Sequence, residues 1–453
     1  MSKTIKLRKG LDIKLVGEAD KVKANVDFAN NFVIRPGDFH GLTPKLVVKI
    51  GDQVKAGSVL FYNKYNEEVK FTSPVAGEVT DIVRGEKRKI LSINIRANAD
   101  NAYEDFGTKD VTKISGEEVK KQLLDSGVWA FIKMRPVDVI ANPKDQPKAI
   151  FISAFDSSPL APDYDFVLHG ENVAFQAGIT ALTKLTKGTV HLTVNSDSTP
   201  DTAFSGAKGV QINKISGKHP VGNVGTQIHH IDPINKGEIV WTVNAQDVVI
   251  IGKLFLTGKF DATRIIALTG SEVKTPKYYK SIIGAPVAKI VAGNINDGNV
   301  RIIGGNVLTG DKITADGNLG FYHLQITVIP EGTEPKFMMT KGWMEPGFGK
   351  FSTNRSYFSW MFPNKKYKMD TNLNGEVRNF VVTGEMEKVF PFDIYPMQLV
   401  KSVMYNDIDL MEKLGIYEVA PEDFALCEFV CTSKIDIQDV IRQGLDVIHK
   451  ECM

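Results

Sequence analysis

The feature that most constrains this fold is a strand, a helix and a second strand in succession. Lys148–Phe155 is a short, continuous apolar run, as expected for a parallel strand buried on both faces. Gly188–Val194 is a second strand, and the intervening Glu171–Lys187 is predicted to be a helix with apolar residues near helical spacing, namely Ala174, Ala177, Ala181, Leu182 and Leu185. This β-α-β pattern predicts a Rossmann-like α/β domain.

The turn after the first of these strands argues against a nucleotide. Asp156–Pro162 contains no Gly-x-Gly-x-x-Gly, and a dinucleotide needs those glycines for close approach of its pyrophosphate. We therefore predict a domain that is Rossmann-like in shape but does not bind a nucleotide by that route.

Asp125–Pro136 has the composition of a binding loop for a flat ligand. The helix before it begins at a capping box formed by Ser115 and Glu118, and Gly127 suits the left-handed cap at its end. An aromatic, basic and proline-closed segment follows Gly127. It lacks the further glycines that would let a phosphate approach the backbone.

The N-terminal part resembles the biotinyl/lipoyl-type barrel. Alternating apolar residues flank Gly51–Gly57, with the pattern Gly-Asp-x-Val-x-x-Gly, and Ser73–Val79 follows with Ser-Pro-x-x-Gly-x-Val. In a carrier barrel, a lysine on the intervening hairpin holds the cofactor, and Lys64 is the nearest candidate. Its neighbours match neither biotin nor lipoyl carriers, so we predict a structural barrel over residues 40–98.

The second half of the chain contains two further kinds of segment, one rich in strands and one rich in basic and aromatic residues. Thr263–Val273 and Arg301–Gly310 resemble strands of a β-grasp, soluble-ligand-binding module. Residues 341–368 are basic and aromatic, which suits a partner surface or a headgroup-facing patch, or else a loop whose aromatics pack between domains. The aromatic side chains are Trp343, Phe348, Phe351, Tyr357, Phe358, Trp360, Phe362 and Tyr367, and the basic ones include Lys341. Residues 379–453 are expected to be mainly helical.

A chain of 453 residues is long enough for several domains. We expect a multidomain α+β and α/β protein in four parts. They are an N-terminal region with the barrel (1–100), the Rossmann-like α/β domain (101–260), the β-grasp module (261–335), and the aromatic and basic segment with a helical C-terminal domain (336–453).

Composition excludes several classes of protein. A net charge of +2 gives no argument for nucleic acid. Three cysteines form no disulfide framework and favour a reducing compartment. Met1–Gly10 lacks the apolar core of a secretory signal, and no apolar window is long enough to span a membrane. Contact with a membrane through partner subunits stays open.

Two groups of residues could bind metal, and we favour a structural interpretation of both. Cys427 and Cys431 match the last two cysteines of the ferredoxin pattern, but two thiolates alone cannot hold a [4Fe–4S] cluster, so a packed remnant helix is expected. His219, His229 and His230 could ligate zinc, yet their spacing matches no common motif. Histidines that hydrogen-bond to the backbone of a glycine-rich turn are favoured. No hydrolase, P-loop or zincin motif is present.

The order of these parts, together with Gly252–Gly258 and Ala425–Cys431, resembles the A-subunit family of the bacterial Na+-translocating NADH:quinone oxidoreductases. That family is similar to the C subunit of the Rnf complex and to the flavin subunit of respiratory complex I. The resemblance covers essentially the whole chain. It implies a peripheral subunit on the cytoplasmic side of the bacterial inner membrane, in a complex that couples NADH oxidation and quinone reduction to sodium export. Its partners would be integral membrane and flavin-carrying subunits.

The resemblance also implies the ligand. The related flavin subunits seat flavin mononucleotide on a Gly-Gly-x-Gly-Phe-Pro-Thr loop, where this chain has Gly127–Lys133 with bulky side chains. We expect no cofactor on this chain, with NADH, flavins and iron–sulfur centres on partner subunits. Ubiquinone or menaquinone is a possible ligand: Trp129 and Phe131 could line its site and Arg135 could donate a hydrogen bond. Alternatively, the loop only fills the former flavin cavity.

The sequence leaves two other functions open. One is a catalytic flavoprotein that itself oxidises NADH, which a flavin in the purified chain would reveal. The other is a non-catalytic ligand-binding protein built on the β-grasp module.

Overall fold

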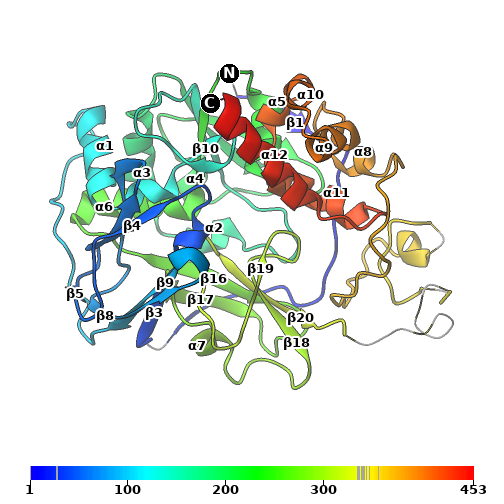
Figure 1. Ribbon diagram of the computed structural model, residues 1–453, viewed down its shortest axis with the longest axis horizontal. Helices are drawn as coiled ribbons and strands as arrows, with labels where there is room; N and C mark the ends of the chain where they lie inside the picture. The colour runs from blue at the N-terminus through cyan, green and yellow to red at the C-terminus, as the bar shows by residue number, and fades with distance from the viewer. Residues whose placement is uncertain are drawn as a thin grey trace.

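The computed structural model describes residues 2–26, 29–333, 337, 342, 344–345, 347–355 and 357–452. Its strands form sheets of seven, six, four and three strands, and a group of helices lies at the C-terminal end of the described chain (Figure 1). The protein is therefore a mixed α/β structure with a helical C-terminus.

The two smaller sheets build the N-terminal barrel and contain only antiparallel pairs. One contains β3 (Asn31–Ile34), β9 (Ile90–Ala97), β8 (Gly77–Arg84) and β5 (Gln53–Val54), and the other β4 (Pro44–Leu46), β6 (Val59–Asn63) and β7 (Asn66–Thr72). The rings of Phe61 and Phe71 stack with centroids 4.7 Å apart in the buried core. Lys64 lies exposed in the turn between β6 and β7.

The seven-stranded sheet contains the predicted β-α-β unit. Its order is β1 (Thr4–Lys6), β14 (Gln211–Ser216), β13 (Thr189–Asn195), β12 (Ala149–Ser153), β15 (Val240–Asn244), β10 (Lys133–Arg135) and β11 (Val139–Ile140). The first five strands are parallel, and β10 runs antiparallel to both of its neighbours. The chain proceeds from β12 to β13 and β14 on one side, and then returns to place β15 on the other side of β12.

Helices α3 (Asn172–Thr183) and α6 (Ala245–Thr257) pack tightly together. A Cβ at Gly252 would lie 1.8 Å from the carbonyl oxygen of Ala174, and one at Gly178 would lie 2.1 Å from that of Val248, so glycine is required at both positions. The predicted helix over 171–187 ends earlier than expected, at Thr183. The reason is that the next residues close a tighter turn, in which the N–H of Lys184 donates to the carbonyl of Ala181.

The predicted start and end of the helix before the loop are confirmed. Helix α1 (Gly116–Asp125) carries the complete capping box of Ser115 and Glu118. Gly127 has a φ of 75° and leads into the 3₁₀ turn η3 (Val128–Phe131). The residues that follow Gly127, Val128–Phe131, are therefore buried in the core.

The six-stranded sheet has the order β19 (Asp311–Ile313), β18 (Val300–Gly304), β20 (Gln325–Pro330), β16 (Thr263–Thr269), β17 (Lys277–Ile282) and β2 (Asp20–Asn25). It has a hydrophobic core of its own, to which α7 (Ala288–Val291) contributes. Because β1 and β2 are edge strands of the two large sheets, the first 25 residues connect these sheets.

The C-terminal region is mainly helical, as expected. It contains α8 (Met386–Val389), α9 (Pro396–Met404), α10 (Ile408–Lys413), η5 (Ile416–Glu418), η6 (Pro421–Phe424), α11 (Ala425–Val430) and α12 (Ile437–Cys452). The remaining short helices are η1 (Pro36–Asp38), η2 (Glu86–Arg88), α2 (Tyr164–Val167), α4 (Thr202–Ser205), α5 (Val224–Ile231) and η4 (Phe358–Met361). No helix in the described ranges is both long and apolar enough to cross a membrane.

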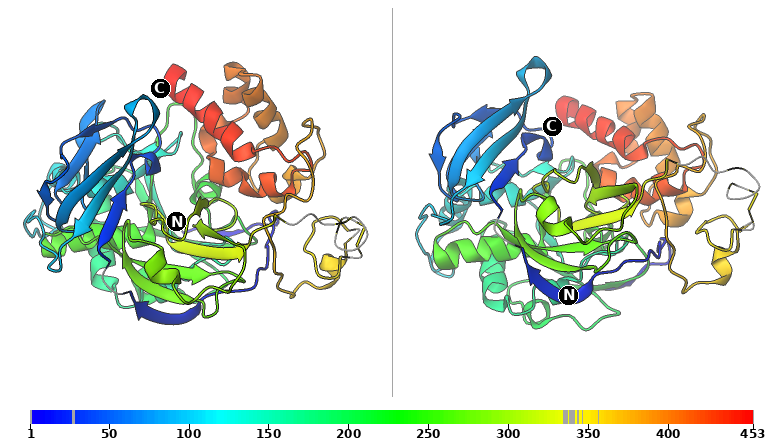
Figure 2. Two further views of the ribbon diagram at one scale, coloured as in Figure 1. Left: turned by 60° about the horizontal axis from the view of Figure 1, so that its bottom comes forward. Right: turned by 90° about the horizontal axis from the view of Figure 1, so that it is seen from below.

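The described residues around η4 project away from the sheets (Figure 2). Trp360 is 59% exposed and Phe348 57% exposed, whereas Tyr367 is buried and its N–H donates to the carbonyl of Lys14. The segment therefore contains both exposed and packed aromatics. Lys341 and Trp343 lie outside the described residues.

Candidate functional site

A cavity of about 230 Å³ lies at the carboxyl ends of β12 and β15. These two strands are neighbours at the point where the strand order reverses, which is where open α/β sheets bind ligands. The lining includes Phe131 and Arg135 of the predicted loop. Other lining residues lie at the carboxyl ends of β12 and β15 or shortly after them. They are Ser153, Phe155, Asp156, Ser158, Thr242, Val243, Asn244 and Asp247.

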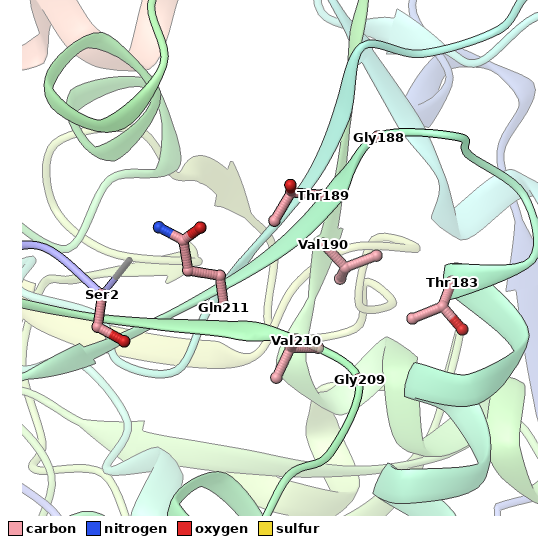
Figure 3. A pocket seen from close by; sticks show the side chains of 8 residues that line it. All are labelled: Ser2, Thr183, Gly188, Thr189, Val190, Gly209, Val210 and Gln211. Carbon is pink, nitrogen blue, oxygen red and sulfur yellow. The ribbon is translucent and has the colours of Figure 1, made fainter.

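A larger and more open hollow of about 540 Å³ lies at the other end of the sheet, beside the start of β13 (Figure 3). Its lining comprises Ser2, Thr183, Gly188, Thr189, Val190, Gly209, Val210 and Gln211. None of these side chains is charged or aromatic. The smaller cavity, which has both kinds of side chain, is therefore the better candidate.

Phe131 belongs to an aromatic cluster beside the cavity. Its ring stacks on Phe321 with centroids 5.0 Å apart, and the Arg264 guanidinium lies 5.3 Å from the Phe131 centroid. The neighbouring Tyr322 also lines the cavity and donates its hydroxyl to the carbonyl of Ala130 at 2.7 Å. Phe131 and Tyr322 therefore make one side of the cavity aromatic.

Trp129 lies in the core and is not among the side chains that line the cavity. Its indole N–H donates to the carbonyl of Ala141 at 2.7 Å, and its ring meets Trp241 edge-on at 5.3 Å. The structure therefore brings Phe131 and Arg135 to one cavity. Trp129 lies outside that cavity and fixes the loop through its hydrogen bond to Ala141.

Arg135 is buried and its terminal nitrogens are already occupied. One donates to Asp423 at 2.8 Å and the other to Glu422 at 2.5 Å. Burial by itself would lower the pKa of Arg135, but the two carboxylates outweigh it and hold that pKa above its ordinary value. The remaining nitrogen, Nε, has no partner among the described residues. This ion pair joins the sheet to the C-terminal helices.

Asp247 is a second buried carboxyl group of the cavity. The Arg264 guanidinium donates to its Oδ1 from β16. Burial raises the pKa of Asp247 to about 6, although Arg264 and Lys133 oppose the shift. A carboxyl group whose pKa lies near neutrality can change its protonation state at physiological pH.

The first turn of the loop leaves no room for a phosphate. A Cβ at Gly127 would lie 2.6 Å from Oγ1 of Thr72, and that hydroxyl donates to the carbonyl of Ser126. Val128 and Ile132 are fully buried in the core. The residues present therefore do not fit a flavin phosphate at this loop.

The three histidines that could have bound zinc, His219, His229 and His230, do not face a common point where a metal ion could bind. His219 lines the cavity and its Nδ1 lies 3.0 Å from Oγ of Ser157, while burial lowers its pKa. His229 pairs with Glu418 at 2.7 Å, and His230 bonds to the backbone carbonyl of Pro391. Over the described part of the chain, no three His, Cys, Asp or Glu side chains cluster as metal ligands would.

Cys427 and Cys431 are both buried and unbridged. The short helix α11 carries Cys427, and Cys431 is the residue that caps its C-terminal end, with an extended ψ of 115°. Burial raises the pKa of the Cys427 thiol. A protonated thiol in a packed core is a poor nucleophile and a poor metal ligand.

Several cavity residues were not predicted from the sequence, notably Asp156, Asn244 and Asp247. All three lie just after a buried parallel strand or at its last residue. Polar residues at the carboxyl ends of two such strands were the available signal, but only the sheet order shows that the two ends are adjacent.

Comparison with known proteins supports the sequence resemblance. Residues 5–98 match a family model described as the NqrA N-terminal barrel-sandwich hybrid domain. Residues 114–260 match the NqrA second alpha/beta domain, and residues 265–315 match the NQRA C-terminal domain. These three matches, in chain order, place the chain in the class of multi-domain NqrA proteins.

Curated relatives share most of their length with this chain. It is 36% identical over 450 residues to the A subunit of the Na(+)-translocating NADH-quinone reductase from Yersinia pestis bv. Antiqua (strain Angola), covering 99% of this chain and 100% of the relative. It is 37% identical over 451 residues to that of Neisseria meningitidis serogroup A / serotype 4A, with the same coverage. The chain therefore belongs to the A-subunit family of the Na(+)-translocating NADH-quinone reductases.

Solved structures add little. An NAD+-reducing [NiFe]-hydrogenase in the air-oxidized state matches with a TM-score of 0.38 and 10% identity over 74% of this chain and 61% of that one. A similarity of this extent carries no argument about function.

Proposed function

We propose that this chain is the peripheral A subunit of a Na+-translocating NADH:quinone reductase and that its cavity receives a quinone headgroup. The observation that carries the proposal is the position of Phe131 on the wall of a small cavity where the strand order reverses. At about 230 Å³ the cavity is below the roughly 300–1,000 Å³ of drug-sized sites. It suits the headgroup of a quinone, the one ring of ubiquinone or the two fused rings of menaquinone, better than a dinucleotide.

Each predicted site residue has a distinct role in this proposal. Phe131 borders the cavity with an aromatic side chain that a quinone ring can contact. Arg135 shapes the cavity through its ion pairs, and of its nitrogens only Nε has no partner among the described residues and can donate to a ligand. Trp129 acts indirectly, by holding the loop against Ala141.

The same proposal covers the finer architecture and the setting. We assign a Rossmann-like fold to the seven-stranded sheet and a β-grasp fold to the six-stranded one, with the four-part division predicted from the sequence. The subunit would lie on the cytoplasmic side of the membrane, with integral membrane and flavin-carrying subunits as partners. Recovery of the native chain free of every membrane subunit, under conditions that keep complexes intact, would count against this setting.

We further propose that the flavin, the iron–sulfur centre and the NADH site belong to partner subunits. The packing of Val128 and Ile132, and of Gly127 against Thr72, supports this for the flavin. A visible absorption spectrum of the purified chain tests it, because bound flavin would favour the alternative of a catalytic NADH-oxidising flavoprotein.

The quinone site can be tested with a photoreactive quinone that crosslinks to the purified chain. We expect crosslinks on the lining segments after β12 and β15, and competition by unlabelled quinone. Leu308 is a half-buried lining residue, so Leu308→Trp should fill the cavity and reduce labelling at least fivefold. Leu410→Trp, at an exposed position on α10, is the matched control. Labelling elsewhere, or equal labelling of both variants, would refute the site.

A further inference from the structure

Asp247 is placed where a ligand in the cavity would meet it. It lies in the first turn of α6, directly after β15, with Asn244 capping the helix through the N–H of Gln246. The side chain is buried, and it lines the cavity together with Phe131. A buried carboxyl group needs polar partners, and here the protein supplies them incompletely.

Arg264 satisfies only one of the two carboxyl oxygens. It donates to Oδ1 and is itself held over the ring of Phe131. Among the described residues, Arg264 donates to Oδ1 and no hydrogen bond to Oδ2 is present, while Ser158 has a buried hydroxyl oxygen without a partner. The cavity therefore has at least one acceptor, and a hydroxyl, left for a ligand.

An ionised carboxylate can only accept hydrogen bonds. The two carbonyl oxygens of a quinone also only accept, whereas the hydroxyl groups of its reduced form, the hydroquinone, donate. We propose that Asp247 makes this cavity selective for hydroquinone over quinone, by accepting a hydrogen bond from a phenolic O–H. This inference rests on the proposed function, because it assumes that the cavity takes the ring.

The neighbouring donors do not impose this choice, whereas the other lining carboxylates, like Asp247, can only accept hydrogen bonds when ionised. Lys133 can donate to either form, and the Ser158 hydroxyl can donate or accept. The groups that face Asp247 electrostatically are Arg264, Lys133, Tyr164 and Tyr322, and the lining also holds the carboxylates Asp138, Asp156 and Glu422. Among the lining carboxylates, Asp247 is the one that Arg264 holds beside the aromatic wall.

The selectivity should depend on pH. Burial raises the pKa of Asp247 to about 6, so the group is ionised at pH 8 and mainly protonated at pH 5. A protonated carboxyl group can donate to a quinone carbonyl. The preference for hydroquinone should therefore be largest at pH 8 and decline as the pH falls through 6.

The test compares the dissociation constants of ubiquinone-1 and ubiquinol-1 for the full chain under anaerobic conditions. A hydrogen bond to a charged group corresponds to roughly tenfold or more in affinity. We expect ubiquinol-1 to bind at least about tenfold more tightly at pH 8, and the ratio to approach one at pH 5.

Variants separate Asp247 from a general effect of charge. Asp247→Asn alone would leave the buried guanidinium of Arg264 unpaired, so it is combined with Arg264→Gln. This double variant should bind both forms equally at pH 8. The control is Glu331→Gln, which alters a half-buried carboxylate paired with Arg301 away from the cavity, and it should keep the wild-type ratio.

A failure of this selectivity can be told apart from a failure of the quinone site. A wild-type ratio near one at pH 8, or an unchanged ratio in the double variant, overturns the role of Asp247 while the quinone site stands. Failure of both forms to bind overturns the quinone site and this inference together. If the double variant does not fold, the pH dependence of the wild-type ratio decides.

Discussion

Removal of the Arg135 guanidinium tests how the C-terminal helices are attached to the sheet. Arg135→Met keeps much of the side-chain volume but leaves Asp423 without its cation in a fully buried position. At the observed 2.8 Å and an effective dielectric constant of about 20, the lost attraction is roughly 6 kcal/mol before desolvation is counted. Measured losses on breaking buried pairs are about 3–5 kcal/mol, and we expect a value in that range.

The loss of stability in Arg135→Met should depend on pH, and the pKa of Asp423 sets the direction of that dependence. Burial already raises the pKa of Asp423, and loss of Arg135 removes its main opposing charge, so the folded-state pKa rises further above the unfolded value. A raised carboxyl pKa destabilises the folded state at pH values above it, and that cost disappears as the group is protonated. The stability deficit of the variant should therefore be largest near pH 8 and shrink toward pH 5.

Denaturant unfolding at several pH values measures this deficit, and hydrogen exchange locates it. We expect faster exchange in η6 and α12, which contact each other, with little change in the N-terminal barrel. Arg301→Met is the control, because its pair with Glu331 is a third exposed on the arginine side and should contribute less. A deficit below about 1 kcal/mol, or one that is independent of pH, would refute the reasoning.

Three further predictions concern the loop and the helix that leads into it. Gly127→Ala should destabilise the protein by at least about 1 kcal/mol in thermal unfolding, because φ is 75° and the new Cβ would meet Thr72. Trp129→Phe should cost about 1–3 kcal/mol by leaving the carbonyl of Ala141 unpaired, with quinone affinity changed less than about twofold in titration since the ring is outside the cavity. Ser115→Ala should remove the helix cap at a cost of about 0.5–2 kcal/mol, and a melting temperature equal to wild type would contradict the role of the capping box.

Local features of the fold were predictable from the sequence. The capping box of Ser115 and the left-handed cap at Gly127 involve residues within a few positions of each other, so their hydrogen bonds can be predicted from spacing alone. The strand, helix and strand of the β-α-β unit follow from hydrophobic periodicity for the same reason. The family resemblance needed only the order of such segments along the chain.

The candidate site was only partly predictable. Phe131 and Arg135 line one cavity, whereas the indole N–H of Trp129 donates to the carbonyl of Ala141 in the core. That this cavity binds a quinone stays a prediction. Whether Trp129 faces a ligand or the core depends on packing against Trp241. Periodicity within the loop carries no information about that distant partner.

The sequence by itself determined the class of the protein, the caps of its helices and the poor fit of its loop to a phosphate. Only the tertiary structure decided which side chains meet. Arg135 pairs with Asp423, which is 288 residues away in the sequence, and Asp247 of helix α6 accepts a hydrogen bond from Arg264 of the six-stranded sheet. The physical reason is that short-range hydrogen bonds and periodicity are encoded in neighbouring residues. The cavity, in contrast, exists because the order of the parallel strands brings the ends of β12 and β15 together.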